Sequence, residues 1–323
     1  MRPITLHGHT RPLTQVKYNR EGDLLFSASK DFVPNVYYSH NGERLGSFHG
    51  HRGAVRSISI SSNSERLLTG AADNLSIIFQ VETGKLLAKF ECLSPVVAVS
   101  FSMGDKEAFV LTENVMSENS ILHVFDVTKD SFELKYKKII ETNSKPTNAI
   151  YGYLNKTIII TFEDGSIALY DAKTLEKIAE TKDHEKAITD IEMSKDYTHF
   201  ITSSKDATAR VYDPRNLTLI KTLQADRPLN SVSLSAMRPE VILGGGQEAS
   251  EVTTSDAKAG KFDVLFFHKI YEDELGKIGG HFGPVNTLRY HPNGIGFTSG
   301  SEDGTVKIHH FDPDYFSFAY PDQ

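Results

Sequence analysis

The sequence predicts an all-β fold, a seven-bladed β-propeller, because a histidine-based motif and a pattern of apolar residues recur with one period. In four places a histidine is followed eighteen residues later by a hydroxyl residue, and four residues after that by an aspartate. The four sets are His9, Ser27 and Asp31; His51, Thr69 and Asp73; His184, Thr202 and Asp206; and His281, Ser299 and Asp303. Identical offsets indicate a repeat of about 42 residues, a length typical of propeller blades.

Apolar residues extend this repeat to the segments that lack the full motif. They fall four, seven and nine residues after each histidine, as at Leu13, Val16 and Tyr18, and the same triplet recurs in three further segments. The seven equivalent histidine positions are 9, 51, 92, 142, 184, 225 and 281. Seven repeats nearly fill the 323 residues, so we expect one domain over 1–323, with 312–323 as an aromatic and acidic tail.

Each repeat predicts four short strands. The apolar triplet predicts a first strand with alternating faces, and a second apolar run carries the hydroxyl residue. The aspartate lies in a tight turn, and a turn such as Asn41-Gly42 leads from the third strand to the fourth. The last repeat supplies only three strands, so we expect residues 3–7 to pair with 305–311 and close the ring. Seven such sheets arranged radially bury faces that one sheet leaves exposed.

The histidine sets suggest a catalytic triad, and the repetition argues against it. A nucleophilic triad occurs once per active site and lies in a cleft, whereas this set recurs at the same place in four repeats. We interpret each imidazole as a bridge between the turn aspartate and the strand hydroxyl, which satisfies buried polar groups. The sequence therefore predicts a protein that is not an enzyme.

Two weaker motifs also favour structural interpretations. His291, His309 and His310 lie near His281 in the sequence, but zinc needs about four convergent ligands and no such set is apparent. The glycine-rich segment Leu243–Ala249 lacks the lysine and helix of a phosphate-binding loop, and it fits a strand end with unusual backbone angles. We expect no metal and no cofactor.

Composition and charge exclude several classes of protein. The chain is 39% hydrophobic and 24% charged, as ordinary soluble globular proteins are, and its single cysteine, Cys92, excludes an internal disulfide framework. The first residues lack the apolar core of a signal peptide, and no apolar run approaches a membrane span. A net charge of −7 disfavours non-specific nucleic-acid binding, although it does not exclude a local basic patch.

Two insertions and the tail are the places where the repeat is broken. The insertions lie near 114–119 and at 247–261, both between second and third strands, so both are expected on one face of the disc, where repeat proteins commonly bind partners. The aromatic tail fits either packing along the last blade or anchoring of a partner.

The repeats resemble those of WD40 proteins, and five segments resemble one WD40 family more specifically. The segments are Leu13–Phe26, Asn41–Gly46, Leu243–Ala249 with Val252–Thr254, Gly280–Pro284 and His309–Phe316. They resemble, in order along the whole chain, the i subunit of eukaryotic translation initiation factor three. The chain departs from the family in having no tryptophan. Tyr37, Phe79, Tyr170, Tyr212 and His309 stand where WD40 repeats usually have one.

This resemblance implies a cytoplasmic, non-catalytic scaffold that binds the b and g subunits of the factor. Through them it would support assembly of the small ribosomal subunit with mRNA, and scanning. Asp196 and Asp213 are expected together at the rim between blades five and six, on the face opposite the insertions, holding basic residues of the b subunit's C-terminal helix. Solvated turn residues are the alternative for this pair. Gln247, Tyr315 and Phe316 are further candidates for partner contacts.

Two other classes of function remain as alternatives. A generic WD40 adaptor would bind short peptides in a signalling or ubiquitin-ligase complex, but such adaptors lack the insertion that begins Gly-Gly-Gly-Gln-Glu-Ala at Gly244. A propeller hydrolase would need an unrepeated set of catalytic residues at the central channel, and none is apparent in the sequence.

Overall fold

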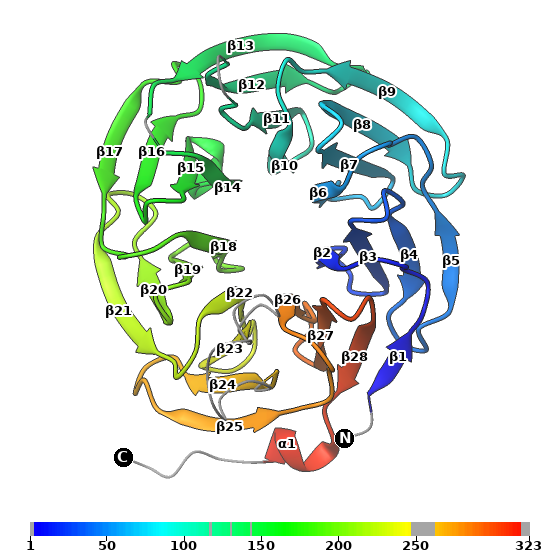
Figure 1. The fold of residues 1–323 in the computed structure, drawn as a ribbon, viewed down its shortest axis with the longest axis vertical. Helices are drawn as coiled ribbons and strands as arrows, with labels where there is room; N and C mark the ends of the chain where they lie inside the picture. The colour runs from blue at the N-terminus through cyan, green and yellow to red at the C-terminus, as the bar shows by residue number, and fades with distance from the viewer. Residues whose placement is uncertain (1–2, 116–117, 130, 143, 247–261, 318–323) are drawn as a thin grey trace.

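The computed structural model describes residues 3–115, 118–129, 131–142, 144–246 and 262–317. Seven four-stranded antiparallel sheets are arranged radially around a central channel (Figure 1). The predicted seven-bladed β-propeller is therefore confirmed. Blades 1 to 6 each consist of four consecutive strands, and blade 7 consists of three C-terminal strands and the N-terminal one.

The strands follow the same order from the channel outward in every blade. The innermost strands are β2 (Leu13–Tyr18), β6 (Val55–Ile60), β10 (Val96–Phe101), β14 (Pro146–Tyr151), β18 (Ile188–Met193), β22 (Leu229–Leu234) and β26 (Val285–Tyr290). The second strands are β3 (Leu24–Ser29), β7 (Arg66–Ala71), β11 (Glu107–Thr112), β15 (Thr157–Phe162), β19 (Phe200–Ser204), β23 (Glu240–Gly245) and β27 (Gly296–Ser301).

The outer half of each blade is formed in the same way. The third strands are β4 (Asn35–Tyr38), β8 (Leu75–Gln80), β12 (Ser120–Asp126), β16 (Ile167–Asp171), β20 (Thr208–Tyr212), β24 (Val264–His268) and β28 (Val306–His310). The outermost strands are β5 (Arg44–Ser47), β9 (Leu86–Glu91), β13 (Glu133–Ile140), β17 (Lys177–Thr181), β21 (Leu219–Gln224), β25 (Glu274–Ile278) and β1 (Ile4–Leu6). A 3₁₀ turn, η1 (Tyr153–Asn155), and the helix α1 (Pro313–Ser317) complete the described elements.

The N-terminal strand closes the ring as predicted. Strand β1 pairs antiparallel with β28, with Ile4 opposite Ile308 and Leu6 opposite Val306. Leu6 and Ile308 are both buried in the cluster between blades 7 and 1. The two ends of the chain therefore share one sheet, and this pairing joins the first blade to the last.

The innermost strands contain a β-bulge that simple alternation does not predict. In all seven blades the register shifts just after the first residue of the inner strand, as between Leu13 and Gln15. A regular strand would turn Leu13 and Val16, three residues apart, to opposite faces. The extra residue of the bulge allows both to be buried. The expected alternation is thus wrong for the first interval of the triplet and right for the second.

Hydrophobic clusters fill the spaces between blades. One cluster combines Phe26 and Phe48 of blade 1 with Phe79 of blade 2, and the Phe48 and Phe79 ring centroids lie 5.5 Å apart. The residues in the expected tryptophan positions are all buried, so Tyr, Phe and His take over the packing. They are Tyr37, Phe79, Tyr170, Tyr212 and His309.

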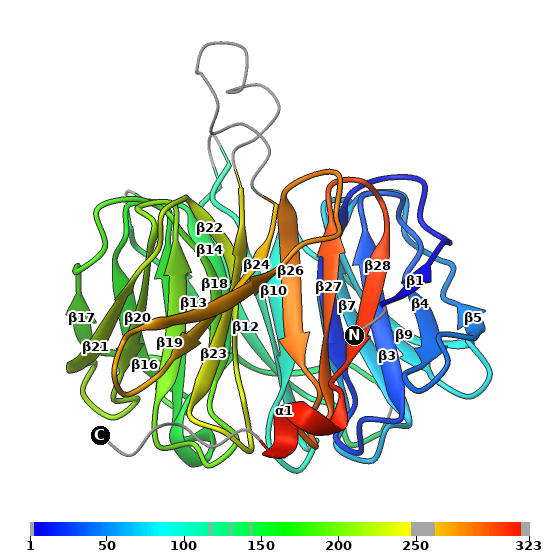
Figure 2. The same cartoon turned by 90° about the horizontal axis from the view of Figure 1, so that it is seen from below.

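The disc has two faces, which we call upper and lower. The upper face carries the connections between second and third strands, where β11 leads to β12 and β23 leads to β24. The lower face carries the connections between first and second strands, and helix α1 lies there (Figure 2). Residues 247–261, and with them Gln247, lie outside the described residues. Among the described helices, none has the length and apolar character needed to cross a membrane.

Candidate functional site

Each of the four histidine sets comes together in space. In blade 1, His9 Nδ1 lies 2.7 Å from Asp31 and His9 Nε2 lies 2.6 Å from Ser27 Oγ. Because an ionised carboxylate only accepts hydrogen bonds, Nδ1 donates to the aspartate and Nε2 accepts from the hydroxyl. The corresponding pairs are His51 with Asp73 (3.1 Å) and Thr69 (2.7 Å); His184 with Asp206 (2.9 Å) and Thr202 (2.8 Å); and His281 with Asp303 (3.2 Å) and Ser299 (2.8 Å).

The aspartates also hold the backbone, a contact that the sequence pattern does not reveal. In each set the amide that follows the histidine donates to the same carboxylate, as Glu185 N does to Asp206 at 3.1 Å. In blades 5 and 7 a fourth member joins: Thr208 Oγ1 and Thr305 Oγ1 lie 2.6 Å from Asp206 and Asp303. These two threonines were missed, and a hydroxyl residue two positions after the aspartate is the signal that could have identified them.

Burial and hydrogen bonding set the protonation states in these networks. Burial lowers the pKa of His51 and of His184, with Asp73 and Asp206 opposing the shift, so both imidazoles are neutral near pH 7. Although burial opposes it, hydrogen bonds from Thr208 and His184 lower the pKa of Asp206 to about 2. The blade 5 set is thus a neutral His184 held by an ionised Asp206. All four sets lie within their own blades.

A second set of polar contacts joins the inner strands around the channel. In five repeats the side chain six positions after the histidine position accepts from a backbone amide of the next blade, as Gln15 does from Ile58 N at 2.7 Å and Ser57 from Val99 N at 3.2 Å. Among the described residues such bonds cross five of the seven blade interfaces. Ala98 has no acceptor at this position, and Asn148 bonds its own neighbour's amide instead. This ladder was not anticipated.

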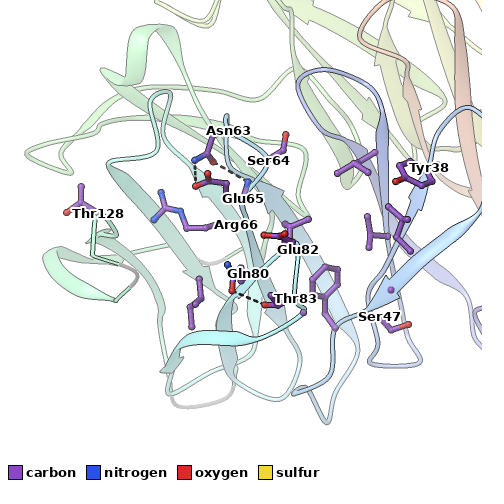
Figure 3. A pocket seen from close by; sticks show the side chains of 18 residues that line it. Tyr38, Ser47, Asn63, Ser64, Glu65, Arg66, Gln80, Glu82, Thr83 and Thr128 are labelled. Atoms are coloured by element: carbon purple, nitrogen blue, oxygen red, sulfur yellow. Dashed lines mark hydrogen bonds between the residues drawn. The ribbon is translucent and has the colours of Figure 1, made fainter.

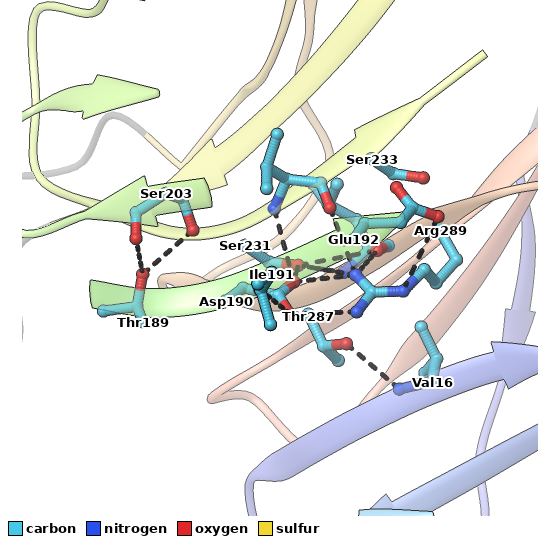
Figure 4. Close-up of polar contacts among 12 residues, drawn as sticks. Val16, Thr189, Asp190, Ile191, Glu192, Ser203, Ser231, Ser233, Thr287 and Arg289 are labelled. Atoms are coloured by element: carbon cyan, nitrogen blue, oxygen red, sulfur yellow. Dashed lines mark hydrogen bonds and ion pairs between the residues drawn. The ribbon is translucent and has the colours of Figure 1, made fainter. Parts of the chain in front are cut away.

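Asp190 of this ladder also takes part in a buried ion pair inside the channel. Arg289 of β26 donates to both oxygens of Asp190 of β18, at 2.7 and 2.9 Å, and so reaches past blade 6 (Figure 4). Ser231 of β22 donates to the same carboxylate. Although burial opposes it, Asp190 and Glu192 raise the pKa of Arg289. The pair joins three blades by charge-assisted bonds.

Several hollows mark the surface of the described residues. A cavity of about 780 Å³ opens where the channel meets the lower face, and a smaller one of about 420 Å³ opens on the upper face. A groove of about 980 Å³ lies between blades 1 and 2, with Tyr38 and Ser47 on one side and Glu65, Arg66 and Gln80 on the other (Figure 3). We call the first cavity the lower channel mouth. It is lined by Lys17, Arg20, Lys195, Met237, Lys269 and Ile270, among others.

Asp196 and Asp213 both lie in lower-face turns of blade 5. Asp196 follows β18, is exposed, and accepts hydrogen bonds from Ser194 Oγ (2.6 Å) and Thr198 N (3.1 Å). The bond from Ser194 is the main cause that lowers the pKa of Asp196 to about 2. Asp213 follows β20 and accepts from Arg215 N at 2.8 Å. Each carboxylate is held within its own turn, and Asp196 lines the lower channel mouth.

The two aromatic tail residues have different environments. The Tyr315 ring stacks on Phe311 with centroids 3.8 Å apart, and its hydroxyl donates to the buried Glu240 of blade 6. Arg238 donates to the Tyr315 carbonyl at 2.8 Å. Phe316 is 52% exposed. Tyr315 therefore packs across blades 6 and 7, which fits one expected role of the tail, and Phe316 faces solvent.

The glycine-rich segment and His291 of the last blade have clear structural environments. A side chain at Gly245 would place its Cβ 2.1 Å from Pro228 O, and Gly246 has a φ of 137°. The two ring nitrogens of His291 are engaged, Nε2 donating to Gly22 O and Nδ1 accepting from Asn293 N. In the described part of the chain, no group of three or more His, Cys, Asp or Glu residues could hold a metal ion. Cys92 is buried, and burial raises its pKa to about 12.

Comparison with known proteins gives matches over the full length. The EIF3I family model matches residues 1–321. Proteins named eukaryotic translation initiation factor 3 subunit I are similar to this chain: that of Nematostella vectensis is 45% identical, with 98% of each chain covered. That of Aspergillus terreus is 46% identical, covering 99% of this chain and 97% of its own. That of Drosophila melanogaster is 45% identical, with 98% of each covered.

Among solved structures, the β-propeller domain of Cps50 (Swd1) from Myceliophteria thermophila superposes with a TM-score of 0.79. It covers 96% of this chain and 98% of its own, at 16% identity. At that identity the similarity concerns the fold alone.

Proposed function

The chain belongs to the EIF3I family of translation initiation factor subunits, and from this premise we propose that it is a non-catalytic scaffold of initiation factor 3. In this role it binds the b and g subunits in the cytoplasm and supports assembly and scanning of the small-subunit preinitiation complex. The observation that carries the proposal is the match to the family over nearly the whole chain. No direct sequence-specific contact with nucleic acid is part of this role.

The histidine sets support a scaffold rather than an enzyme. In each set the hydroxyl, imidazole and carboxylate are bonded to one another and to a backbone amide within the blade. Their repetition in four blades suits a device that stabilises turns, because a catalytic set would be single and open to substrate. We propose that these twelve residues are structural.

The lower face of blade 5 is the proposed docking place of the b subunit. Asp196 and Asp213 are anchored by their own turns, so their charges are fixed on the surface before a partner arrives. Fixed carboxylates steer basic partners and set their register more than they add affinity. Phe316, at 52% exposure, is a further candidate contact, because aromatic side chains are common interface anchors.

A native pull-down tests this function. The full chain, tagged at one end and expressed in its own cells, is expected to bring down the b and g subunits in comparable amounts, identified by mass spectrometry. Enrichment of ubiquitin-ligase or signalling components without the b and g subunits would instead favour the generic adaptor. A variant with Asp196→Lys and Asp213→Lys is expected to recover less b subunit at equal expression.

A further inference from the structure

We propose that the lower channel mouth binds an acidic, partly apolar peptide segment. The mouth gathers basic side chains from four blades: Lys17 and Arg20 from blade 1, Lys195 from blade 5, Lys269 from blade 6 and Arg289 from blade 7. The chain as a whole carries a net charge of −7, so this concentration of positive charge is local. A concave basic site focuses its field on an anionic ligand.

Arg289 is paired with Asp190, but the four other basic side chains named above keep their positive charge. The lysines of the mouth contact neutral acceptors. Lys17 Nζ donates to Ile58 O at 2.8 Å, Lys195 Nζ donates to Pro292 O at 3.2 Å, and Lys269 Nζ lies 3.3 Å from His199 Nε2. Within the described ranges, no carboxylate forms an ion pair with these lysines or with Arg20.

Two carboxylates, Glu192 and Asp196, line the mouth, and they are fewer than its basic side chains. Asp196 is bonded within its turn, and Glu192 accepts from Leu234 N at 2.7 Å and lies 4.0 Å from Arg289. Lys17 is partly buried. Burial and the charge of Arg289 lower its pKa to about 8. An anion bound beside it would stabilise its charged form, because an opposite charge favours the ionised state.

The apolar residues at the mouth favour a peptide over RNA. Met237 and Ile270 are 71% and 54% exposed at the edge of the same cavity, where they can cover apolar side chains of a ligand. Single-stranded RNA needs free aromatic faces on which bases stack. Tyr18 packs against His291 with its hydroxyl bonded to Thr298, and Tyr290 is buried. These two rings are therefore occupied.

The mouth is large enough for several residues of extended chain. A neighbouring cavity of about 500 Å³ shares Lys17, Arg20 and Lys195 with it, so the basic side chains line one continuous basin on the lower face. Asp196 lines this basin and the Asp213 turn does not, so the basin adjoins the proposed docking turns. Its ligand is opposite in charge to a basic helix. The inference therefore goes beyond the proposed docking of the b subunit.

Fluorescence anisotropy on the full chain at low salt tests the proposal. The probe is a fluorescein-labelled peptide of repeating Glu-Glu-Leu units, with a Gln-Gln-Leu peptide of equal length and an oligouridine as comparisons. Arg20→Glu with Lys195→Glu is expected to weaken binding of the acidic peptide at least about tenfold. The matched control, Lys129→Glu with Lys173→Glu, changes the net charge equally at exposed positions on other blades and is expected to bind as the wild type does.

The outcomes separate the alternatives. Binding of the acidic peptide alone, lost only in the mouth variant, supports the site. The proposal is overturned if the acidic peptide does not bind, if the neutral peptide binds as well, or if the control variant loses as much. Tighter binding of oligouridine that is lost in the mouth variant would assign the basin to RNA instead. Melting temperatures of both variants verify that the fold is intact, since Arg20 and Lys195 are exposed.

Discussion

The histidine network of blade 5 is predicted to stabilise the fold through Asp206. Replacing Asp206 with alanine removes the acceptor of four hydrogen bonds: His184 Nδ1 (2.9 Å), Glu185 N (3.1 Å), Thr208 N (2.9 Å) and Thr208 Oγ1 (2.6 Å). His184 is 1% exposed, so its ring N–H loses its partner in a buried site. An unsatisfied buried donor costs about 1–3 kcal/mol, and a lost backbone bond about 1 more, so we expect about 3 kcal/mol in all.

Blade 4 provides a matched control for this substitution. Asp164 occupies the same place in its repeat, but Thr142 stands in the histidine position. Its carboxylate accepts from Ser166 N (3.2 Å), Ser166 Oγ (2.6 Å) and the exposed Lys182 (3.1 Å), with no imidazole. Ser166 is buried, but Lys182 is exposed and no imidazole N–H loses its partner, so Asp164→Ala is expected to cost less, about 1 kcal/mol. The network histidine thus accounts for the difference.

Urea unfolding at pH 7 measures both free energies of unfolding. Circular dichroism and tyrosine fluorescence are suitable probes, because the chain has thirteen tyrosines and no tryptophan. Coincident transitions by both probes justify one free energy for each variant. Equal losses for Asp206→Ala and Asp164→Ala, or a negligible loss for Asp206→Ala, would refute the reasoning.

Three further predictions concern acid sensitivity, the channel and closure of the ring. Burial lowers the pKa of His309 to about 3. Below about pH 6.5 this histidine therefore binds a proton in the unfolded state and stays neutral in the folded state, so the free energy of unfolding falls on acidification. His309→Phe, which keeps the ring stacked on Phe297, should reduce the drop in melting temperature between pH 7 and pH 5; an unchanged drop would contradict this. Arg289→Met should lower the free energy of unfolding in urea by about 3–5 kcal/mol, because it leaves Asp190 without its ionic partner. Adding Asp190→Asn should recover part of this loss, and no recovery would argue that the pair does not stabilise the fold. Leu6→Ala, in the closing strand, should cost about 2–4 kcal/mol, and a loss confined to a few tenths would show that the closure contributes little.

Much of the fold could be predicted because the repeat appears in the sequence as a regular spacing of histidine, aspartate and apolar residues. The positions four residues after each histidine position, such as Leu13 and Val285, are the first residues of the inner strands. The bulge beside them was not foreseen, because a three-residue interval in a strand can mean either a bulge or a broken pattern. The paired strands decide between these, and that pairing is a long-range property.

Polar contacts of the candidate site could be predicted only where both partners lie in the same repeat. The partners of His9 and His184 follow at fixed offsets, so the sequence indicates them. The ladder through Gln15 and the pair between Asp190 and Arg289 join different blades. In the sequence those residues do not stand out from the other polar residues of their strands. The lower channel mouth likewise gathers lysines far apart in the chain, which only the closed ring brings together.

The most direct test of the proposed scaffold role is a calorimetric titration of the b subunit's C-terminal segment into this protein at low salt. We predict binding to the wild type and about tenfold weaker binding to the variant with Asp196→Lys and Asp213→Lys. The melting temperature of the variant should stay nearly unchanged, because both side chains lie in surface turns. Equal affinity of the two proteins for the segment would rule out these turns as its docking place, and no binding to the wild type would contradict the scaffold role itself.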